Sequence, residues 1–455
     1  MAKASKALPQ YIAGLSAGFG SFCLGATIGW SAPAEKMITE DIEYGFAVST
    51  NQFGWISSLL TLGATCVCVP VGFLIDRIGR KPTMLALIPP YMIGWVLMIF
   101  AKNVAMLYCG RFILGVCGGA FCVTAPIYTT EISTLATRGM LGSFFQLLIV
   151  FGILYGYVVG AFVHLQLLNI LCAILPMIFA AFFLFMPESP VYLALKGQKE
   201  AAAKSLAWLR GKHYDVDDEL KQIMSGVEQS GSKTGIAAAL KRPITLKGLG
   251  IAVLLQIFQQ LTGINAIVFY STSIFADVGA GLSASMSTIL IGGTQVVMTL
   301  VAVNIIDKVG RRILLAISAF FMALTTALMG GYFQMRQNSE ESVASLGWLP
   351  ICSICMFIIF FAIGFGPVPW LIGAELFSED VKAVAGSVAG TSNWLMAFAV
   401  TKLFPILQSS LGPAPTFWIF TVIAIMAFIY SLLWVPETKG KTLNEIQEML
   451  GSKNS

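Results

Sequence analysis

Asp76-Arg77-Ile78-Gly79-Arg80-Lys81 and Asp307-Lys308-Val309-Gly310-Arg311-Arg312 are two versions of one charged motif, and each closes a long apolar stretch. The two copies lie 231 residues apart in a chain of 455. Two more pairs of motifs repeat in the same order, with offsets of 244 and 249 residues. These are Glu131…Arg138-Gly139 with Glu375…Lys382, and Pro187-Glu188-Ser189-Pro190 with Pro436-Glu437-Thr438-Lys439. A repeat of about half the chain length in such an apolar sequence predicts a duplicated bundle of transmembrane helices.

The composition requires a bilayer as the solvent for much of the chain. Hydrophobic residues make up 57% and charged residues 11%, with a mean hydropathy of +0.81. An ordinary soluble domain has about 45–50% apolar and about 25% charged residues. The net charge of +5 is modest, and aromatic residues do not interleave with basic runs. The lipid bilayer is therefore an expected partner and nucleic acid is not.

The apolar stretches predict an all-α membrane protein with twelve spans, since a bilayer core needs about 20 apolar residues per helix. The first six form an N-terminal bundle within 1–190, near 10–30, 53–75, 84–101, 106–129, 140–163 and 165–186. The other six form a C-terminal bundle within 248–436, near 248–276, 283–306, 313–335, 348–377, 384–407 and 414–435. A tail over 437–455 follows.

A polar region over 191–247 separates the two bundles and carries helical patterning. One amphipathic stretch runs from Glu200 to Arg210 and another from Asp217 to Val227, and a third short piece follows Ser230-Gly231-Ser232. We interpret this region as a helical linker domain under the membrane; binding of a partner protein is the alternative.

The distribution of basic residues predicts the orientation. If the N-terminus is cytoplasmic, 23 of the 28 Lys and Arg residues fall on the inner side. The exceptions, outside or at outer helix ends, are Lys36, Lys102, Arg111, Arg336 and Lys402. The positive-inside rule then places both termini in the cytoplasm, and we expect a multi-pass protein of the plasma membrane.

The sequence predicts neither a metal nor a cofactor. All nine cysteines lie in apolar stretches, where small buried side chains are expected, and the two histidines lie in different regions. No nucleophile, base or metal constellation assembles, so an enzyme is not expected.

The seventh span holds the densest group of polar side chains inside the predicted membrane. Gln259, Gln260 and Asn265 fall within seven residues, and Gly263 between them allows the helix to loosen. An amide donates and accepts hydrogen bonds, as a sugar hydroxyl does. We therefore predict a binding site for a neutral polyhydroxylated substrate; hydrogen bonding between helices is the alternative.

Other spans offer side chains of the same kind. The candidates are Gln146 in the fifth span, Gln295 in the eighth, Asn393 with Trp394 in the eleventh, and Trp370 after Gly364-Phe365-Gly366-Pro367-Val368-Pro369. Glycine and proline in that last segment predict a bent tenth span. Aromatic rings could cover the C–H faces of a sugar, although packing against lipid or core is an equal alternative.

Charged side chains are expected only at the ends of the spans. A carboxylate at mid-membrane is costly and commonly marks coupling to a proton or ion. Its absence favours an uncharged substrate and transport without a driving ion.

The repeated charged loops predict an inner gate. Basic and acidic side chains oppose each other there and could latch the bundles when the inside is shut. The positive-inside rule alone would explain the basic residues but not the matched carboxylates. The predicted gate residues are Arg77, Arg80, Glu131, Arg138, Glu188, Arg311, Arg312, Glu375, Lys382 and Glu437.

Together these motifs, with Gln259-Gln260-x-x-Gly263-x-Asn265, resemble the sugar porter family of the major facilitator superfamily over the whole chain. The resemblance implies alternating access between two six-helix domains. Gly29-Trp30-Ser31-Ala32-Pro33, the Gly-Phe-Gly-Pro-Val-Pro-Trp segment and Ala399–Lys402 look most like insect facilitated trehalose transporters and related glucose facilitators. By that similarity Gln146, Gln259, Gln260, Asn265, Asn393 and Trp370 would contact sugar.

Several positions depart from the family pattern. Thr27 stands where proton-coupled members place an Asp and many facilitators an Asn, which supports uniport and makes Thr27 a candidate site residue. Gln295 replaces a binding Asn of glucose facilitators, and its longer arm would reshape the pocket. Lys382 replaces an arginine of the gate and loses bidentate pairing.

The function predicted from the sequence is facilitative transport of trehalose by a protein expected to be monomeric. A glucose or hexose facilitator, a proton-coupled symporter and a sugar sensor without transport activity remain alternatives.

Overall fold

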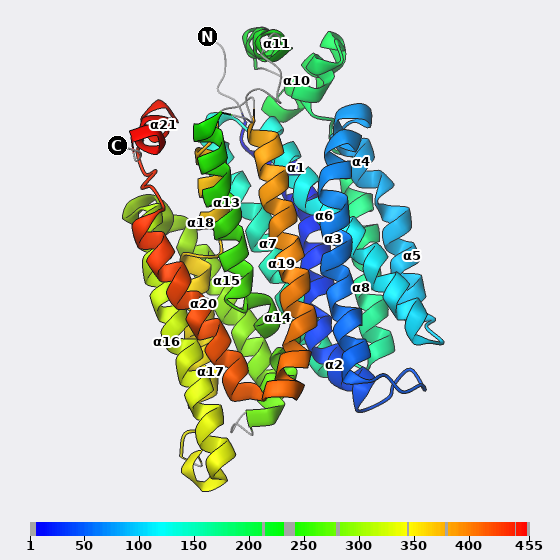
Figure 1. The fold of residues 1–455 in the computed structure, drawn as a ribbon. Coiled ribbons are helices and arrows are strands. Elements are labelled where there is room, and N and C mark those ends of the chain that lie inside the picture. The colour runs from blue at the N-terminus through cyan, green and yellow to red at the C-terminus, as the bar shows by residue number, and fades with distance from the viewer. Residues whose placement is uncertain are drawn as a thin grey trace.

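In the computed structural model, the chain forms a bundle of long helices with a smaller helical layer across one end (Figure 1). The structure describes residues 6–211, 214–231, 242–278, 283–343, 345–377, 381–441 and 443–452. The third piece expected in the linker, after Ser230-Gly231-Ser232, lies almost entirely outside these residues. Twelve segments in the described part are long and apolar enough to cross a membrane.

The first half of the chain contributes eight helices to the bundle. They are α1 (Leu8–Gly29), α2 (Ser31–Thr39), α3 (Thr50–Ile78), α4 (Arg80–Ala86), α5 (Ile88–Ile99), α6 (Val104–Ile132), α7 (Leu135–Phe162) and α8 (Leu165–Phe183). Three further helices, α9 (Pro190–Leu195), α10 (Lys199–Arg210) and α11 (Asp217–Gly231), form the layer across the end.

The second half of the chain repeats this arrangement. Its helices are α13 (Pro243–Leu261), α14 (Ile264–Val278), α15 (Ala284–Val309), α16 (Arg311–Asn338), α17 (Leu349–Ile363), α18 (Val368–Glu375), α19 (Lys382–Leu411) and α20 (Pro413–Leu433). A short 3₁₀ helix, Glu340–Val343, precedes α17, and α21 (Leu443–Ser452) follows the bundle.

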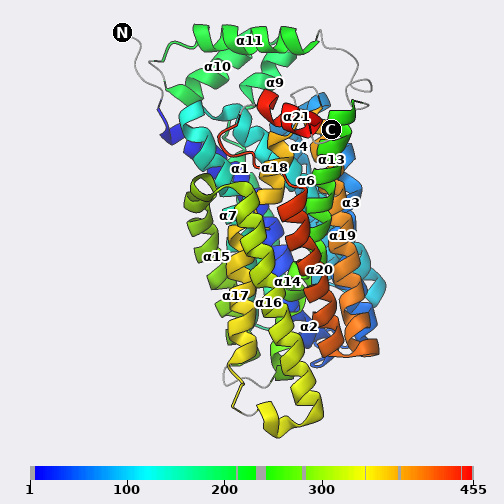
Figure 2. The same ribbon diagram turned by 60° about the vertical axis from the view of Figure 1, so that its left-hand side comes forward.

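The two ends of the bundle differ. We call the end that carries α9–α11 and α21 the linker end and the opposite end the far end (Figures 1 and 2). The beginning of α1 and the C-terminal helix both lie at the linker end, since the backbone N–H of Lys6 donates to the carbonyl of Arg210 and Lys247 donates to that of Leu450. At the far end the α16–α17 connection projects beyond its neighbours (Figure 2).

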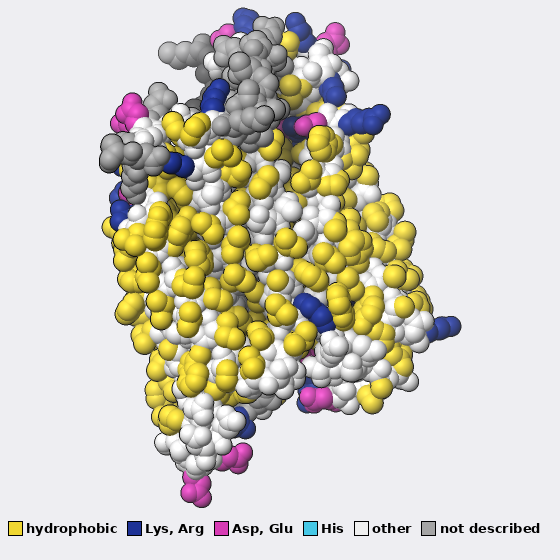
Figure 3. Space-filling model, in the orientation of Figure 1, with side chains coloured by type: hydrophobic (Ala, Val, Ile, Leu, Met, Phe, Trp, Pro, Cys, Tyr) yellow, Lys and Arg dark blue, Asp and Glu magenta, His cyan; other side chains and the backbone are white. Residues whose placement is uncertain are grey.

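Hydrophobic side chains cover the flank of the bundle, and charged side chains gather mainly at its two ends (Figure 3). This distribution is what a bilayer around the middle of the helices requires. Three of the cysteines expected to be buried, Cys66, Cys109 and Cys352, are exposed. Lipid rather than water would surround these cysteines. Since a lipid-facing surface is apolar like a buried one, an apolar stretch does not reveal which of its faces is turned inward.

Four spans of the described part are interrupted, one of them at Leu87 between α4 and α5. The first breaks at Trp30, between α1 and α2, and so continues to Thr39 beyond its expected end at residue 30. Pro33 is tolerated there because it lies in the first turn of α2, whose N–H groups have no partner within the helix. The seventh span breaks at Thr262-Gly263, where Gly263 has φ of +98°, and the tenth breaks between Gly364 and Pro367. The sequence predicted the last two interruptions.

Candidate functional site

An amide cluster lies at the break of the seventh span. The Nε2 of Gln260 donates to Oδ1 of Asn393 at 3.0 Å, and Nδ2 of Asn265 donates to Oε1 of Gln260 at 2.6 Å. The Nδ2 of Asn393 lies 2.5 Å from Oε1 of Gln259 and 2.7 Å from Oε1 of Gln256. The cluster thus joins α13 and α14 to α19, and four of its five members are buried.

Gln259 also supports the break of the tenth span. Its Nε2 donates to the carbonyls of Phe365 and Gly366 at 2.6 and 2.7 Å. These carbonyls lie in the interruption between α17 and α18, where the regular helical hydrogen bonds stop. A broken helix within a membrane needs such a replacement donor, because lipid offers none. The same side chain therefore serves the amide cluster and the break.

Gln256 is the member of the cluster that the sequence analysis missed. It lies on α13 one turn before Gln259 and Gln260, and spacings of three and four residues place side chains on one face of a helix. That spacing was the available signal.

The remaining candidates do not join the cluster through hydrogen bonds that the structure identifies. Gln146 is half-buried on α7, and Trp394 is half-buried on α19. The side chain of Trp370 on α18 is 43% exposed, and its ring faces Gly390 of α19, where an added Cβ would lie 3.7 Å from it.

Gln295 on α15 is buried, and its Oε1 has no hydrogen-bond partner within the described part of the structure. Leaving a buried acceptor unpaired costs about 1–3 kcal/mol. Helices α7 and α15, which carry Gln146 and Gln295, pack against each other across the two halves. A buried amide oxygen without a partner marks a position where a ligand could donate.

Thr27 lies inside the N-terminal half. Its hydroxyl is 2.8 Å from the carbonyl of Cys23, to which it donates, and 2.9 Å from the Tyr91 hydroxyl. Its own carbonyl accepts a hydrogen bond from Arg111 at 2.8 Å. All of these contacts are made within that half.

Arg111 corrects the expectation that charges lie only outside or at the outer helix ends. It is fully buried in α6, seven residues and so about 10 Å from the N-terminal end of the helix. Its guanidinium donates to the carbonyls of Ile56 and Thr27 and to the hydroxyl of Ser31, and lies 4.8 Å from the centre of the Trp30 ring. These partners are all neutral. They come from α3 and both sides of the α1–α2 break, so this buried cation holds the break in place.

Lys402 also lies deeper than expected, nine residues before the end of α19. Buried Glu35 on α2 accepts a hydrogen bond from the hydroxyl of Ser273 on α14. The prediction that charged side chains avoid the interior of the spans is therefore wrong for Arg111.

The repeated motifs form the same structure in both halves. Arg80 Nη2 lies 2.7 Å from Glu131, and Arg311 Nη2 lies 3.0 Å from Glu375. Arg80 also donates to the carbonyl of Ile75, as Arg311 does to that of Ile306. Each motif therefore ties one helix end to a neighbouring helix of its own half.

The glycines of the motifs make room for two further carboxylates. Gly79 and Gly310 both have φ of +107°, and a Cβ there would lie 2.4 Å from Glu188 and 2.8 Å from Glu437, respectively. Glu188 accepts from the backbone N–H of Lys81, and Glu437 accepts from those of Arg311 and Arg312. Each carboxylate thus caps a helix N-terminus, where the helix dipole favours negative charge.

The pKa values of the two capping carboxylates are shifted in opposite directions. Burial raises the pKa of Glu188 despite its hydrogen bonds from backbone amides. Burial also acts to raise the pKa of Glu437, but the N–H donors of Lys439, Arg311 and Arg312 outweigh it and lower that pKa.

The other gate residues lie nearby. The carbonyl of Arg77 accepts from the Tyr192 hydroxyl, the Arg138 side chain is exposed, and Lys382 is half-buried at the start of α19. The arginine–glutamate pairs described above join residues of one half, so the proposed latch between the halves remains a prediction.

The hydrogen bonds that the structure identifies between the halves lie toward the far end. The hydroxyl of Tyr157 on α7 donates to the carbonyl of Val268 on α14 at 2.6 Å. Lys402 on α19 donates to Asn51 Oδ1 at the start of α3 at 2.6 Å. With the Ser273–Glu35 pair, these contacts close the bundle at that end.

Two repeated bundles of membrane-spanning helices, the second of which buries a cluster of polar side chains, are typical of a membrane transporter. The sequence matches the family model "Sugar (and other) transporter" over residues 7–450, and the chain belongs to that family.

Curated relatives narrow the comparison. The chain is 36% identical over 452 residues to a protein of Drosophila sechellia named "Facilitated trehalose transporter Tret1-2 homolog", covering 99% of this chain and 92% of that one. It is 35% identical over 446 residues to "Trehalose transporter 1" of Drosophila melanogaster, covering 97% of this chain and 52% of that one.

Solved structures share the fold. The E. coli xylose transporter XylE, in a partially occluded inward open conformation, superposes with a TM-score of 0.79 at 23% identity, covering 95% of this chain and 99% of that one. The chain is therefore an all-helical membrane protein with the major facilitator fold, as the sequence predicted. Its family is one of transporters, not enzymes.

Proposed function

We propose that the protein is a facilitative uniporter that moves trehalose across the plasma membrane by alternating access. The names of the relatives at about 36% identity support the choice of substrate. The amide cluster supports a neutral sugar over an ion, because its side chains combine donors and acceptors without a net charge.

The observation that carries the proposal is the buried, paired cluster of Gln256, Gln259, Gln260, Asn265 and Asn393 at a helix break. Five amides within one cluster exceed what packing two helices needs. A sugar that displaced some of these hydrogen bonds could replace them with hydrogen bonds to its own hydroxyl groups. Gln146, Gln295, Trp370, Trp394 and Thr27 stay in the proposal as further site residues.

Uniport rests on Thr27 and Arg111. Proton coupling within a membrane needs a group that changes its charge, and carboxylates fill this role in many transporters. Thr27 offers a hydroxyl rather than a carboxylate, and the hydrogen-bond partners that the structure identifies for Arg111 are neutral. We therefore expect flux that follows the sugar gradient alone.

The contacts between the halves support alternating access. Opening at the far end would break the Tyr157–Val268, Ser273–Glu35 and Lys402–Asn51 bonds. We assign the linker end to the cytoplasm from the distribution of basic residues. The charged loops there would then meet across the halves when the inside is shut, and a monomer suffices for this cycle.

Uptake of labelled trehalose and labelled glucose into proteoliposomes, with and without an imposed pH gradient, tests the proposal. We expect trehalose to equilibrate without a response to pH, and Gln260→Ala to abolish uptake. Asn304→Ala, which removes an exposed amide of α15, is the matched control and should transport normally.

The other outcomes are distinct. Glucose uptake without trehalose uptake would establish a hexose facilitator. Accumulation above equilibrium under the pH gradient would establish a symporter and overturn the argument from Thr27. Binding of sugar without uptake would indicate a sensor.

A further inference from the structure

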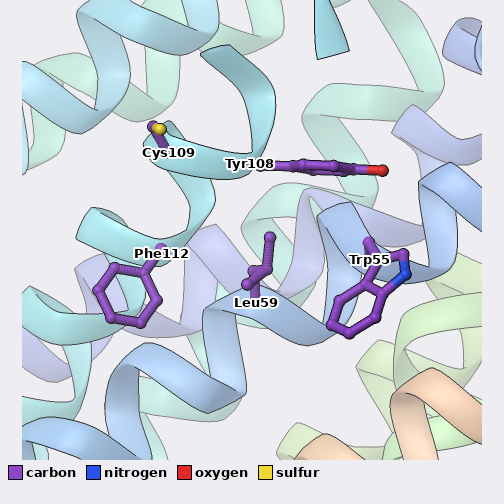
Figure 4. A pocket seen from close by; sticks show the side chains of 5 residues that line it. All are labelled: Trp55, Leu59, Tyr108, Cys109 and Phe112. Atoms are coloured by element: carbon purple, nitrogen blue, oxygen red, sulfur yellow. The ribbon is translucent and has the colours of Figure 1, made fainter. Parts of the chain in front are cut away.

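A surface groove lies between α3 and α6 near the far end (Figure 4). It has a volume of about 450 Å³ and is lined by Trp55, Leu59, Tyr108, Cys109 and Phe112. Figure 4 shows the rings of Trp55 and Tyr108 toward one end of the groove and that of Phe112 toward the other. Apart from the tyrosine hydroxyl, the indole N–H and the thiol, the lining side chains offer an apolar surface.

The groove is closed toward the linker end. One turn beyond Leu59, a Cβ on Gly63 would lie 2.3 Å from the backbone oxygen of Phe112, and one on Gly115 would lie 2.0 Å from that of Leu60. Such distances mean that the backbones of α3 and α6 touch there. The groove is therefore bounded at this level by the contact between the two helices.

A cation borders the groove. The Nζ of Lys402 lies 4.5 Å from the centre of the Trp55 ring, and Trp55 is also part of the groove lining. The ammonium donates to Oδ1 of Asn51 at 2.6 Å and reaches the Asn51 carbonyl at 3.4 Å. A lysine ammonium has three N–H donors, so at least one remains for another acceptor.

The depth of these residues fits the boundary between lipid headgroups and acyl chains. Trp55 and Tyr108 lie in the second turns of α3 and α6, which both begin at the far end. Tryptophan and tyrosine gather at this level of membrane proteins, and a lysine stem can lie along apolar surface while its ammonium reaches the interface.

We propose that the groove and Lys402 form a binding site for one phospholipid. The phosphate accepts a hydrogen bond from the ammonium of Lys402, and one acyl chain lies in the groove against Trp55, Leu59 and Phe112. The charge of Lys402 complements the phosphate, and the adjoining groove provides an apolar surface for the chain. A small soluble anion would use only the first part of this site.

The lipid would link the two halves, because Lys402 belongs to the C-terminal half and the groove belongs to the N-terminal half. Opening at the far end would separate α19 from α3 and divide the site. Bound lipid should therefore stabilise the arrangement that is closed there. This consequence rests on the proposed transport cycle, whereas binding itself can be measured without any sugar.

Thermal unfolding of the purified full-length protein in detergent, with dioleoylphosphatidylglycerol titrated in, tests the binding. We expect saturable stabilisation, and an apparent affinity that falls by about tenfold or more in Lys402→Gln, because a charge-assisted hydrogen bond is lost. Lys102→Gln, which removes an exposed lysine near the same end, is the matched control and should bind like the unsubstituted protein.

Leu59→Trp tests the groove independently of Lys402, since it fills the space but leaves the ammonium and Asn51 in place. It should weaken binding of the lipid, and it keeps the test decisive if Lys402→Gln fails to fold. Inorganic phosphate is titrated in parallel. If phosphate alone stabilises as much as the lipid, or if Leu59→Trp binds lipid normally, the proposal is wrong.

A phospholipid with a photoreactive acyl chain locates the site. We expect adducts on the segments 55–59 and 108–112 that diminish in Lys402→Gln. Adducts spread evenly over the flank, or unchanged by the substitution, would mean ordinary annular lipid and would overturn the proposal.

Discussion

Gly292 on α15 lies directly against Tyr157 on α7, so that a Cβ at Gly292 would come within 2.9 Å of the tyrosine ring. The ring is held by the hydrogen bond from its hydroxyl to the carbonyl of Val268 at 2.6 Å. The absence of a side chain at residue 292 therefore lets the two halves of the molecule meet near the far end.

We expect Gly292→Ala to weaken closure at the far end, because Tyr157 must move to admit the new methyl group. The neighbouring Gly293 has open space around its Cβ position, which makes Gly293→Ala a matched control. Labelling of a cysteine introduced near the amide cluster, by a reagent applied from each side, measures the effect. Labelling from the far side should rise in Gly292→Ala and not in Gly293→Ala. Equal labelling of the two would contradict the role assigned to this contact.

Asn393→Leu should destabilise the protein and abolish transport. The substitution leaves the amides of Gln256, Gln259 and Gln260 without a shared partner, and each unpaired buried group costs about 1–3 kcal/mol. The apparent Tm of the purified protein and sugar uptake are the measurements. Asn304→Leu, on the exposed face of α15, should leave both near normal. A stable, active Asn393→Leu would show that the cluster is dispensable.

Arg111→Lys should lose activity although it keeps the charge. One ammonium cannot reproduce the planar set of donors that reaches Ile56, Thr27 and Ser31 at once. Unpaired acceptors at the α1–α2 break would lower stability by about 1–3 kcal/mol each. Uptake and apparent Tm test this, with Arg336→Lys near the end of α16 as the control. Normal uptake by Arg111→Lys would mean that only the charge matters.

Glu437→Gln should lower the stability of the protein near neutral pH, whereas Glu188→Gln should not. A raised pKa means that the ionised Glu188 carboxylate costs stability near neutral pH, and that this cost disappears as the pH falls through the raised value. Glu437, with a lowered pKa, contributes stability above the ordinary glutamate pKa of about 4.3, and loses it as the pH falls through its own lower value. Near neutral pH, Glu188→Gln should therefore preserve or raise the apparent Tm and Glu437→Gln should lower it.

The two substitutions serve as controls for each other because the motifs are repeats. Apparent Tm values measured across the acidic range should converge on that of the unsubstituted protein, for Glu188→Gln before Glu437→Gln. Identical pH profiles would show that the two caps are electrostatically equivalent.

The sequence predicted the features that depend on composition along the chain. The twelve spans, the loosening at Gly263 and the bend after Gly364 follow from apolar length and from glycine and proline. The break at Trp30 was not predicted, because its stabilising groups come from Arg111 and Asn169, far away in the sequence.

Side-chain placement was harder to predict than the helices. The position of Arg111 along the chain predicts a place outside the bundle or at a helix end, because it does not reveal that three neutral acceptors surround the side chain. Gln256 belongs to no distinctive motif, because its neighbours along the chain are apolar. The pairing of Arg80 with Glu131 and of Arg311 with Glu375, each within one half, depends on how the helices pack, which the spacing of these residues along the chain does not reveal.

Gln259 belongs to the amide cluster and also supports the break of the tenth span, and this combination restricts the kind of ligand that the site can accept. Its amide N–H groups already hold the carbonyls of Phe365 and Gly366. A ligand that claims those N–H groups must return a donor to the two carbonyls, or the break of the tenth span loses its support. A hydroxyl can accept a hydrogen bond from the amide and donate one to a carbonyl, whereas an ether oxygen or a halogen can only accept. The site would then select ligands by the hydrogen bonds that they donate to these backbone carbonyls as much as by their shape.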